Sequence, residues 1–91
     1  MPKSKKKGQK KDLDYYIQNF MNYNVRIPWN IFVKILMSHY GCEMESKRGS
    51  GRLFIKDDCR VTADEPHGRE KFVSKKDRER IIKHLLNKLG L

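Results

Sequence analysis

The spacing of apolar residues changes twice along this chain, and that change limits its fold more than any other feature. In residues 27–41, IPWNIFVKILMSHYG, apolar side chains recur every three or four positions, which is typical of a helix with one buried face. In residues 42–64 apolar and polar side chains alternate, which is typical of half-buried strands. Residues 72–91 return to the helical spacing. We therefore expect a helix, several strands and a second helix, in that order.

Local signals place the ends of these two helices. Pro28 suits a first turn, and Gly41 suits the left-handed position that follows a last turn. Ser74 suits the N-cap of the second helix, with Asp77 as its capping-box partner, and Gly90 is expected to end that helix. The expected core-facing stripes are Trp29, Phe32, Val33, Leu36, Met37 and Tyr40 in the first helix and Ile81, Ile82, Leu85, Leu86 and Leu89 in the second.

An additional helix is expected before these elements, within residues 12–25. Asp12 is a plausible N-cap, and an apolar stripe follows it at helical spacing: Leu13, Tyr16, Ile17, Phe20 and Met21. A helix this short is not stable alone, so we expect the stripe to pack against the next segment.

The alternating region predicts three strands, CEMES, RLFIK and CRVTAD, joined by turns at residues 49–51 and 57–58. The alternation assigns one apolar face to Cys42, Met44, Ser46, Leu53, Ile55, Cys59, Val61 and Ala63. On this phase Arg52, Lys56 and Arg60 line the outer face around Phe54, where an apolar ring framed by cations suits base stacking or a protein partner. The alternative is a register slip that turns the ring of Phe54 inward.

Together these elements predict an α+β fold in which a three-stranded antiparallel sheet carries helices on one face. The expected order is α-β-β-β-α over residues 26–91, with the extra helix in residues 12–25 as part of the same single domain. Residues 1–11, MPKSKKKGQKK, cannot bury apolar area and are expected to be a disordered basic tail.

The formal charge of +10 on 91 residues indicates a polyanionic partner, most often a nucleic acid. Residues 1–11 contribute six lysines and no acid, so the remaining residues carry +4. The tail is either a basic arm on phosphates or a solubilising segment. No transmembrane segment or signal peptide is expected, which predicts a cytoplasmic protein without a membrane partner.

Cysteine usage predicts a reduced, metal-free protein that needs no cofactor. Cys42 and Cys59 fall in separate strands, without the further ligands of a zinc site. A disulfide is not expected in a cytosolic chain, so both side chains are expected to be small half-buried groups.

Residues 27–91 resemble the HicA family of toxins, which are small mRNA interferases. A helix ending KILMSHYG precedes a strand and the pair Gly49-Ser50; two strands, the loop PHGREKF and a last helix ending HLLNKLGL follow. The resemblance implies a double-stranded-RNA-binding-domain-like fold, RNA as the substrate, and a HicB-like antitoxin as the partner.

The chain departs from the family at the catalytic position. In the family a histidine stands one or two residues after the Gly-Ser pair, whereas Gly51 and Arg52 stand here. Metal-free RNA cleavage needs a base that removes a 2′-hydroxyl proton near neutral pH, and arginine stays protonated. His67 is the candidate replacement, with Arg69 or Lys71 on the phosphate; the alternative is a solvated loop histidine.

Basic residues elsewhere complete the candidate RNA site. Lys75 and Lys76 begin the last helix, where double-stranded-RNA-binding domains also carry lysines and where helix N–H groups favour anions. The residues expected to contact RNA or its phosphates are Gly49, Ser50, Gly51, Arg52, Lys56, Arg60, Arg69, Lys71, Lys75 and Lys76. Three functions remain open: a HicA-like endoribonuclease, a non-catalytic RNA-binding module on the same fold, and a protein-interaction domain centred on Phe54.

Overall fold

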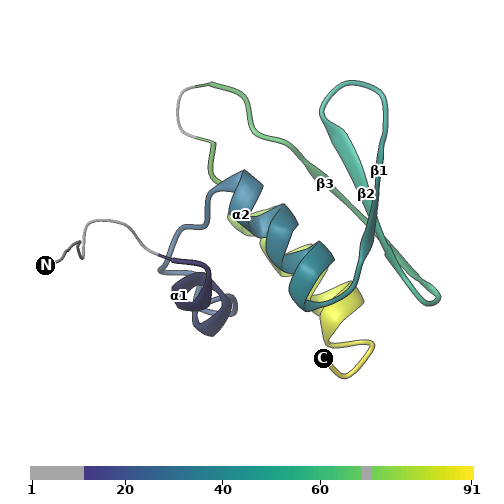
Figure 1. Cartoon of the computed structure of the whole chain (residues 1–91). Coiled ribbons are helices and arrows are strands. Elements are labelled where there is room, and N and C mark those ends of the chain that lie inside the picture. The colour runs from purple at the N-terminus through teal and green to yellow at the C-terminus, as the bar shows by residue number, and fades with distance from the viewer. Residues whose placement is uncertain (1–11, 69–70) are drawn as a thin grey trace, which may run out of the picture.

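Two long helical segments lie on the same side of a three-stranded antiparallel sheet (Figure 1). The structure is a computed structural model, and it describes residues 12–68 and 71–91. The expected α+β class and the antiparallel order β1-β2-β3 are confirmed. The elements in chain order are α1 (Leu13–Gln18), α2 (Trp29–Lys34), η2 (Ile35–His39), β1 (Glu43–Ser46), β2 (Gly51–Lys56), β3 (Cys59–Asp64), α3 (Lys75–Ile81) and η3 (Ile82–Leu86).

Helix α1 is shorter than the helical spacing of residues 12–25 suggests. Its N-cap is Asp12, whose carboxylate accepts a 3.0 Å hydrogen bond from the amide of Tyr15. Asparagines end it early: the side chain of Asn19 donates to the carbonyl of Tyr15, and that of Asn22 accepts from the amide of Asn24. Such local bonds compete with the helical ladder.

The segment after α1 enters the core of the domain. Phe20 is 1% exposed, and its ring stacks on that of Phe32 with centroids 5.4 Å apart. Leu13, Tyr16 and Ile17 pack against the same core from α1. Residues 12–25 and the rest of the domain therefore share one apolar interior.

Helix α2 continues into η2, a wider π-type segment. At the end of η2 the amide of Tyr40 donates a hydrogen bond to the carbonyl of Ile35, five residues back. Gly41 follows with a φ of +75°. The wider turn rotates the side chains that come after it. Met37, which the helical spacing places in the core, is 44% exposed, whereas Ile35 at the start of η2 is fully buried.

Strand β2 has the opposite phase from the one expected. Phe54 is 0% exposed and lies directly opposite Met44, which packs against the core, and Val61, which is part of it. Its ring meets the edges of Trp29 and Phe32, each 6.1 Å away between centroids. The alternative in which the ring of Phe54 points into the core is therefore correct, because that position buries the large ring among other aromatic side chains.

Because Phe54 points into the core, the other residues of β2 also lie on the opposite faces of the sheet from those expected. Leu53 and Ile55 take the outer face, where Leu53 stands opposite Glu45 and Thr62. Arg52 and Lys56 share the face of Phe54, while Arg60 stays on the outer face opposite Ile55. The expected ring of cations around an exposed Phe54 is therefore wrong.

The last helix begins and ends as its sequence predicts. The hydroxyl of Ser74 accepts a 3.1 Å hydrogen bond from the amide of Asp77. At the other end Gly90 has a φ of +74°, and the amide of Leu91 donates to the carbonyl of Leu86, which closes a Schellman-type cap. The apolar stripe is confirmed: Ile81, Ile82, Leu85 and Leu86 are buried and Leu89 packs against the core.

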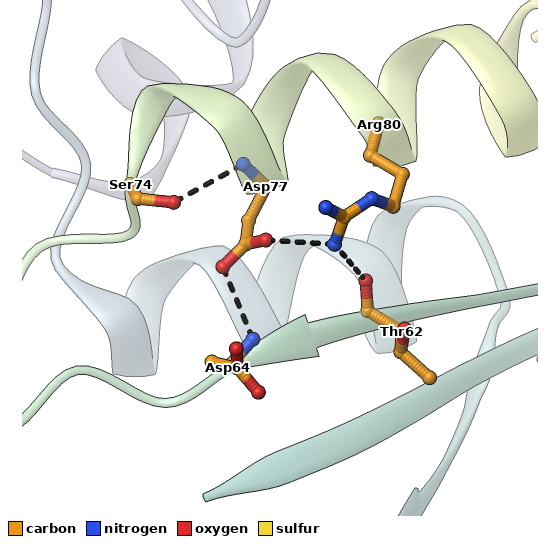
Figure 2. A network of polar contacts seen from close by, with 5 residues as sticks. All are labelled: Thr62, Asp64, Ser74, Asp77 and Arg80. Atoms are coloured by element: carbon orange, nitrogen blue, oxygen red, sulfur yellow. Dashed lines mark hydrogen bonds and ion pairs between the residues drawn. The ribbon is translucent and has the colours of Figure 1, made fainter.

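The carboxylate of Asp77 joins the helix to the sheet rather than completing a capping box (Figure 2). Its Oδ2 accepts from the amide of Asp64 at 3.1 Å, and its Oδ1 accepts from Arg80 at 2.9 Å. Arg80 also donates to the carbonyl of Thr62 at 3.2 Å. The start of α3 is thereby fixed to the end of β3.

A buried arginine fastens the N-terminal segment to α3. Arg78 is 2% exposed, and its guanidinium donates to the carbonyls of residues 19, 20, 22 and 25 at 3.3, 2.6, 3.2 and 2.6 Å. It also lies 5.2 Å from the centre of the Tyr23 ring. Burial lowers the pKa of the Arg78 guanidinium, although arginine keeps its proton at physiological pH. Nothing in the local sequence pattern distinguishes this arginine.

The predicted basic tail, residues 1–11, lies outside the described residues. Within residues 12–68 and 71–91, no helix has the length and apolar character needed to cross a membrane. Cys42 and Cys59 are both buried and both free thiols.

Candidate nucleic-acid site

Two segments that are separate in sequence meet at one end of the sheet. The β1–β2 turn and the segment that follows β3 both lie at the upper end of the sheet in Figure 1. Between them is an open hollow of about 640 Å³, within the range of pockets that hold small ligands. It is lined by Gly49, Ser50, Arg52, Glu65, Pro66, His67, Gly68 and Lys71.

The backbone of the β1–β2 turn depends on Gly49. This residue has a φ of +64°, a conformation that glycine adopts at little cost, and no atom lies within 4 Å of where its side chain would start. Gly51 does not have a positive φ, and a side chain there would meet the Cβ of Lys47 at 3.2 Å. Gly51 begins β2 and does not line the hollow.

The end of β3 is fixed from both sides. The amide of Asp64 donates to Asp77 on α3, and the next amide, that of Glu65, donates to the carbonyl of Ser50 at 2.9 Å. Consecutive N–H groups thus point to the helix and to the turn. The junction places Glu65 and the residues after it beside Gly49 and Ser50.

Arg52 is held within the wall of the hollow. Its Nη1 donates to the carbonyls of Gly49 and Gly51 at 3.0 and 2.8 Å, and its Nη2 forms a 2.9 Å ion pair with Glu65. A phosphate contact would have to compete with these acceptors. The geometry therefore favours a role in shaping the turn over the direct phosphate contact expected from sequence.

His67 and Lys71 supply the remaining functional groups of the hollow. His67 is exposed, and its side chain forms no hydrogen bond within the described residues. Lys71 is also exposed, while its carbonyl accepts a 2.7 Å hydrogen bond from the amide of Trp29 at the start of α2. The backbone of Lys71 is thus anchored and its ammonium group is available to an anion.

The other two histidines lie elsewhere. The ring of His39 meets the edge of Tyr40 with centroids 4.8 Å apart, at the end of η2. His84 is on η3 and lines a different groove. His67 is therefore the histidine that the fold places beside the Gly-Ser turn.

Lys56, at the far end of β2 from the hollow, has a different environment. A side chain at Gly41 would meet the Lys56 ammonium at 3.2 Å, so this cation lies at the carboxyl end of η2, where it is favourable for the helix dipole. Burial raises the pKa of the Cys42 thiol, and the nearby Lys56 opposes this shift. Arg60 is exposed on the outer face of the sheet, and Arg69 lies outside the described residues.

The lysines that begin α3 lie outside the hollow too. Lys75 is beside the ring of Tyr23, 6.0 Å from its centre, in a smaller pocket with Arg26 and Phe72. Lys76 lines a groove along α3 and η3 that Tyr23 also lines. The helical pattern identifies the lysines, but the contribution of Tyr23 comes from a loop and has no sequence signal.

Within the part of the chain that the structure describes, no three histidine, cysteine or acidic side chains are grouped closely enough to hold a metal ion. Comparison with protein-family models, curated proteins and solved structures gives no match.

Proposed function

We propose that this chain is an RNA-binding protein of the HicA toxin type, on a double-stranded-RNA-binding-domain-like fold, with a weak endoribonuclease activity that depends on His67. The observation that supports this proposal is the meeting of two sequence segments at one hollow. The family-like Gly-Ser turn contributes Gly49 and Ser50, and the Pro-His loop with its lysine contributes His67 and Lys71.

The proposed reaction uses the RNA as its own nucleophile. His67 removes the proton of a 2′-hydroxyl, whose oxygen attacks the neighbouring phosphorus. The bond from phosphorus to the 5′-oxygen breaks, and that oxygen takes a proton from water. The products are a 2′,3′-cyclic phosphate and a 5′-hydroxyl, and no metal takes part. Lys71 stabilises the negative charge that gathers on the phosphate oxygens.

Two features support weak rather than efficient catalysis. Arg52 occupies one of the two positions at which the family carries its histidine, and its guanidinium is already bound to two carbonyls and to Glu65. His67 reaches the hollow from an exposed loop segment, and no hydrogen bond from residues 12–68 or 71–91 holds its side chain in one orientation. A base without a fixed position loses much of the advantage of preorganisation.

A non-catalytic RNA-binding module on the same fold is the second candidate. It is favoured because the guanidinium of Arg52, at the family's catalytic position, is already bound to two carbonyls and to Glu65. The third candidate, a protein-interaction domain centred on an exposed Phe54, loses its basis because that ring is fully buried.

The first experiment separates binding from cleavage. The purified chain is incubated with a long RNA with and without EDTA, and binding is measured on a short RNA by fluorescence anisotropy. We expect slow cleavage that EDTA does not change, that His67→Ala abolishes and that the matched variant His84→Ala leaves intact. Lys71→Ala should weaken binding several-fold, and Lys88→Ala, an exposed lysine beyond η3, should not.

The outcomes divide the candidates. Binding without any cleavage identifies the non-catalytic module. Vigorous cleavage that persists in His67→Ala removes His67 from the mechanism. Loss of RNA affinity when residues 1–11 are deleted shows that only the tail attracts RNA, and the hollow then has no part in binding.

We also propose a HicB-like antitoxin as the protein partner. Expression of the chain alone should slow bacterial growth, and co-expression of the product of an adjacent gene should restore it. Unimpaired growth at high expression, together with a failure of that product to bind the chain, would exclude a toxin–antitoxin role.

A further inference from the structure

Glu65 is the one acidic side chain among the described residues that line the hollow. A carboxylate repels phosphate, so its presence in a site proposed to bind RNA needs a reason. Of the two cations that line the hollow with it, Arg52 is paired with Glu65 and Lys71 forms no side-chain hydrogen bond within the described residues.

The carboxylate of Glu65 is fixed in place. Its amide is bound to the carbonyl of Ser50, and its Oε1 accepts a hydrogen bond from Arg52 at 2.9 Å. Arg52 is itself held by the carbonyls of Gly49 and Gly51. The side chain of Glu65 remains 31% exposed. Its second oxygen, Oε2, has no partner within the described residues.

An ionised carboxylate only accepts hydrogen bonds, so its complement is a group that presents donors. Unpaired RNA bases are commonly recognised through their Watson–Crick edges. Guanine presents two adjacent donors on that edge, N1–H and the N2 amino group. Adenine and cytosine each place an acceptor nitrogen beside their amino group, and uracil places its single N–H between two carbonyls.

We infer that Glu65 reads an unpaired guanine base in the hollow, with Lys71 on a neighbouring phosphate and Arg52 as a positioning residue for the carboxylate. This inference rests on the proposed RNA-binding function and adds a base preference to it. The same carboxylate that would repel a phosphate selects a base edge, so Glu65 and Lys71 bind different parts of one nucleotide chain.

Short RNAs that differ at one base test the inference. Each is a uridine oligomer with guanine, hypoxanthine (the base of inosine), adenine, cytosine or uracil at its centre, and a 2′-deoxy sugar at that position prevents cleavage there. Dissociation constants are measured by fluorescence anisotropy at one fixed salt concentration. We expect guanine to bind about tenfold more tightly than adenine, cytosine or uracil, the size of one good bidentate base contact. Inosine, which lacks the N2 amino group, should bind with intermediate affinity.

Variants identify the source of this preference. Glu65→Gln should reduce the preference for guanine to about twofold or less, because an amide offers one acceptor beside a donor. Arg52→Ala should also reduce it, whereas Glu43→Gln, an exposed acid on the outer face of the sheet, should leave it unchanged. Circular dichroism and the urea midpoint of each variant confirm that it is folded.

The remaining outcomes overturn the inference in distinguishable ways. Equal affinity for all the oligomers, or a preference for another base, removes guanine recognition and leaves RNA binding in place. A uniform rise in affinity for every oligomer in Glu65→Gln shows that Glu65 only repels phosphate. Failure of the unmodified chain to bind any oligomer defeats the proposed function itself.

Discussion

The guanidinium of Arg78 on α3 donates a 2.6 Å hydrogen bond to the carbonyl of Phe20, 58 positions earlier in the chain. The two residues connect the beginning of the domain to its last helix, and both are buried. Phe20 supplies the apolar contact in the core, and Arg78 satisfies the carbonyls that the short helix α1 and the turns after it leave without helical partners. Through these hydrogen bonds Arg78 attaches the N-terminal segment to α3.

Arg78→Ala should lower the free energy of unfolding by about 3 kcal/mol, because the four carbonyls that it binds would lose a charged donor. Arg78→Lys should restore only part of the loss, since one ammonium group cannot reach carbonyls spread over residues 19–25. Urea unfolding measures both variants. Lys83→Ala, on the exposed face of the same helix, is the control and should change stability by less than about 0.5 kcal/mol. A loss below about 1 kcal/mol in Arg78→Ala would show that water replaces the guanidinium.

Asp77→Ala should release the end of β3 from α3. The amide of Asp64 and the guanidinium of Arg80 both lose an acceptor, at a cost of about 1–3 kcal/mol. Hydrogen exchange of the Asp64 amide should accelerate more than exchange of amides in the middle of β3. Glu79→Ala, an exposed acid on α3 two residues after Asp77, should leave that exchange rate unchanged. Equal exchange in the two variants would place the restraint on β3 elsewhere.

Local chemistry in the sequence was sufficient for some elements and insufficient for others. Ser74, Gly41 and Gly90 act through neighbours within a few residues, so a cap or a left-handed turn can be predicted from the residue types alone. Phe54 stands between two other apolar residues, so either phase of β2 leaves an apolar stripe and only packing against Trp29 and Phe32 decides it.

The candidate site shows the same division. The Gly-Ser turn and the loop with His67 and Lys71 are each visible in the sequence, and the order of the strands brings them together. The partners of Arg52 are not visible there, because one of them, Glu65, is 13 positions away and the others are backbone carbonyls. The role of a basic residue therefore depends on acceptors that its type does not reveal.

The thiol of Cys42 should make stability depend on alkaline pH. Burial raises its pKa above the ordinary value of 9.0, so the folded state favours the protonated thiol. This contribution is complete below that value and is lost as the pH rises through the higher folded pKa. The phenol of Tyr40, whose pKa burial also raises, acts in the same direction above 10.0. Urea unfolding of the chain and of Cys42→Ala should give stabilities that converge as the pH is raised; a constant difference would contradict the expected shift.

Cys42 should also react slowly with alkylating reagents. In a Cys59→Ser background the thiol is shielded and largely protonated at neutral pH, and the thiolate is the reactive form. Iodoacetamide should modify it much faster in denaturant than in the folded chain. Equal rates in the two conditions would mean that the thiol is accessible in the folded state.

RNA binding should weaken steeply with salt. If about six phosphates are contacted, the logarithm of the association constant should fall with the logarithm of salt concentration at a slope of about −4 to −5. Deletion of residues 1–11, which carry six lysines, should flatten the slope and leave measurable binding. A slope that the deletion does not change would place all the phosphate contacts on the remaining residues.

The opposite directions of the Asp64 and Glu65 amides have a consequence for the lengths that related sequences can have. Adding or removing one residue at this junction would reverse the directions of the two N–H groups. The amide that now donates to Asp77 on α3 and the amide that now donates to Ser50 in the β1–β2 turn would each point away from that acceptor. Among the residues that the structure describes, the two-residue turn at Asp57 and Asp58 forms no such pair of bonds to other elements. Homologues should therefore differ in length between β2 and β3 more readily than at the exit of β3, where the residue types can change but their number cannot.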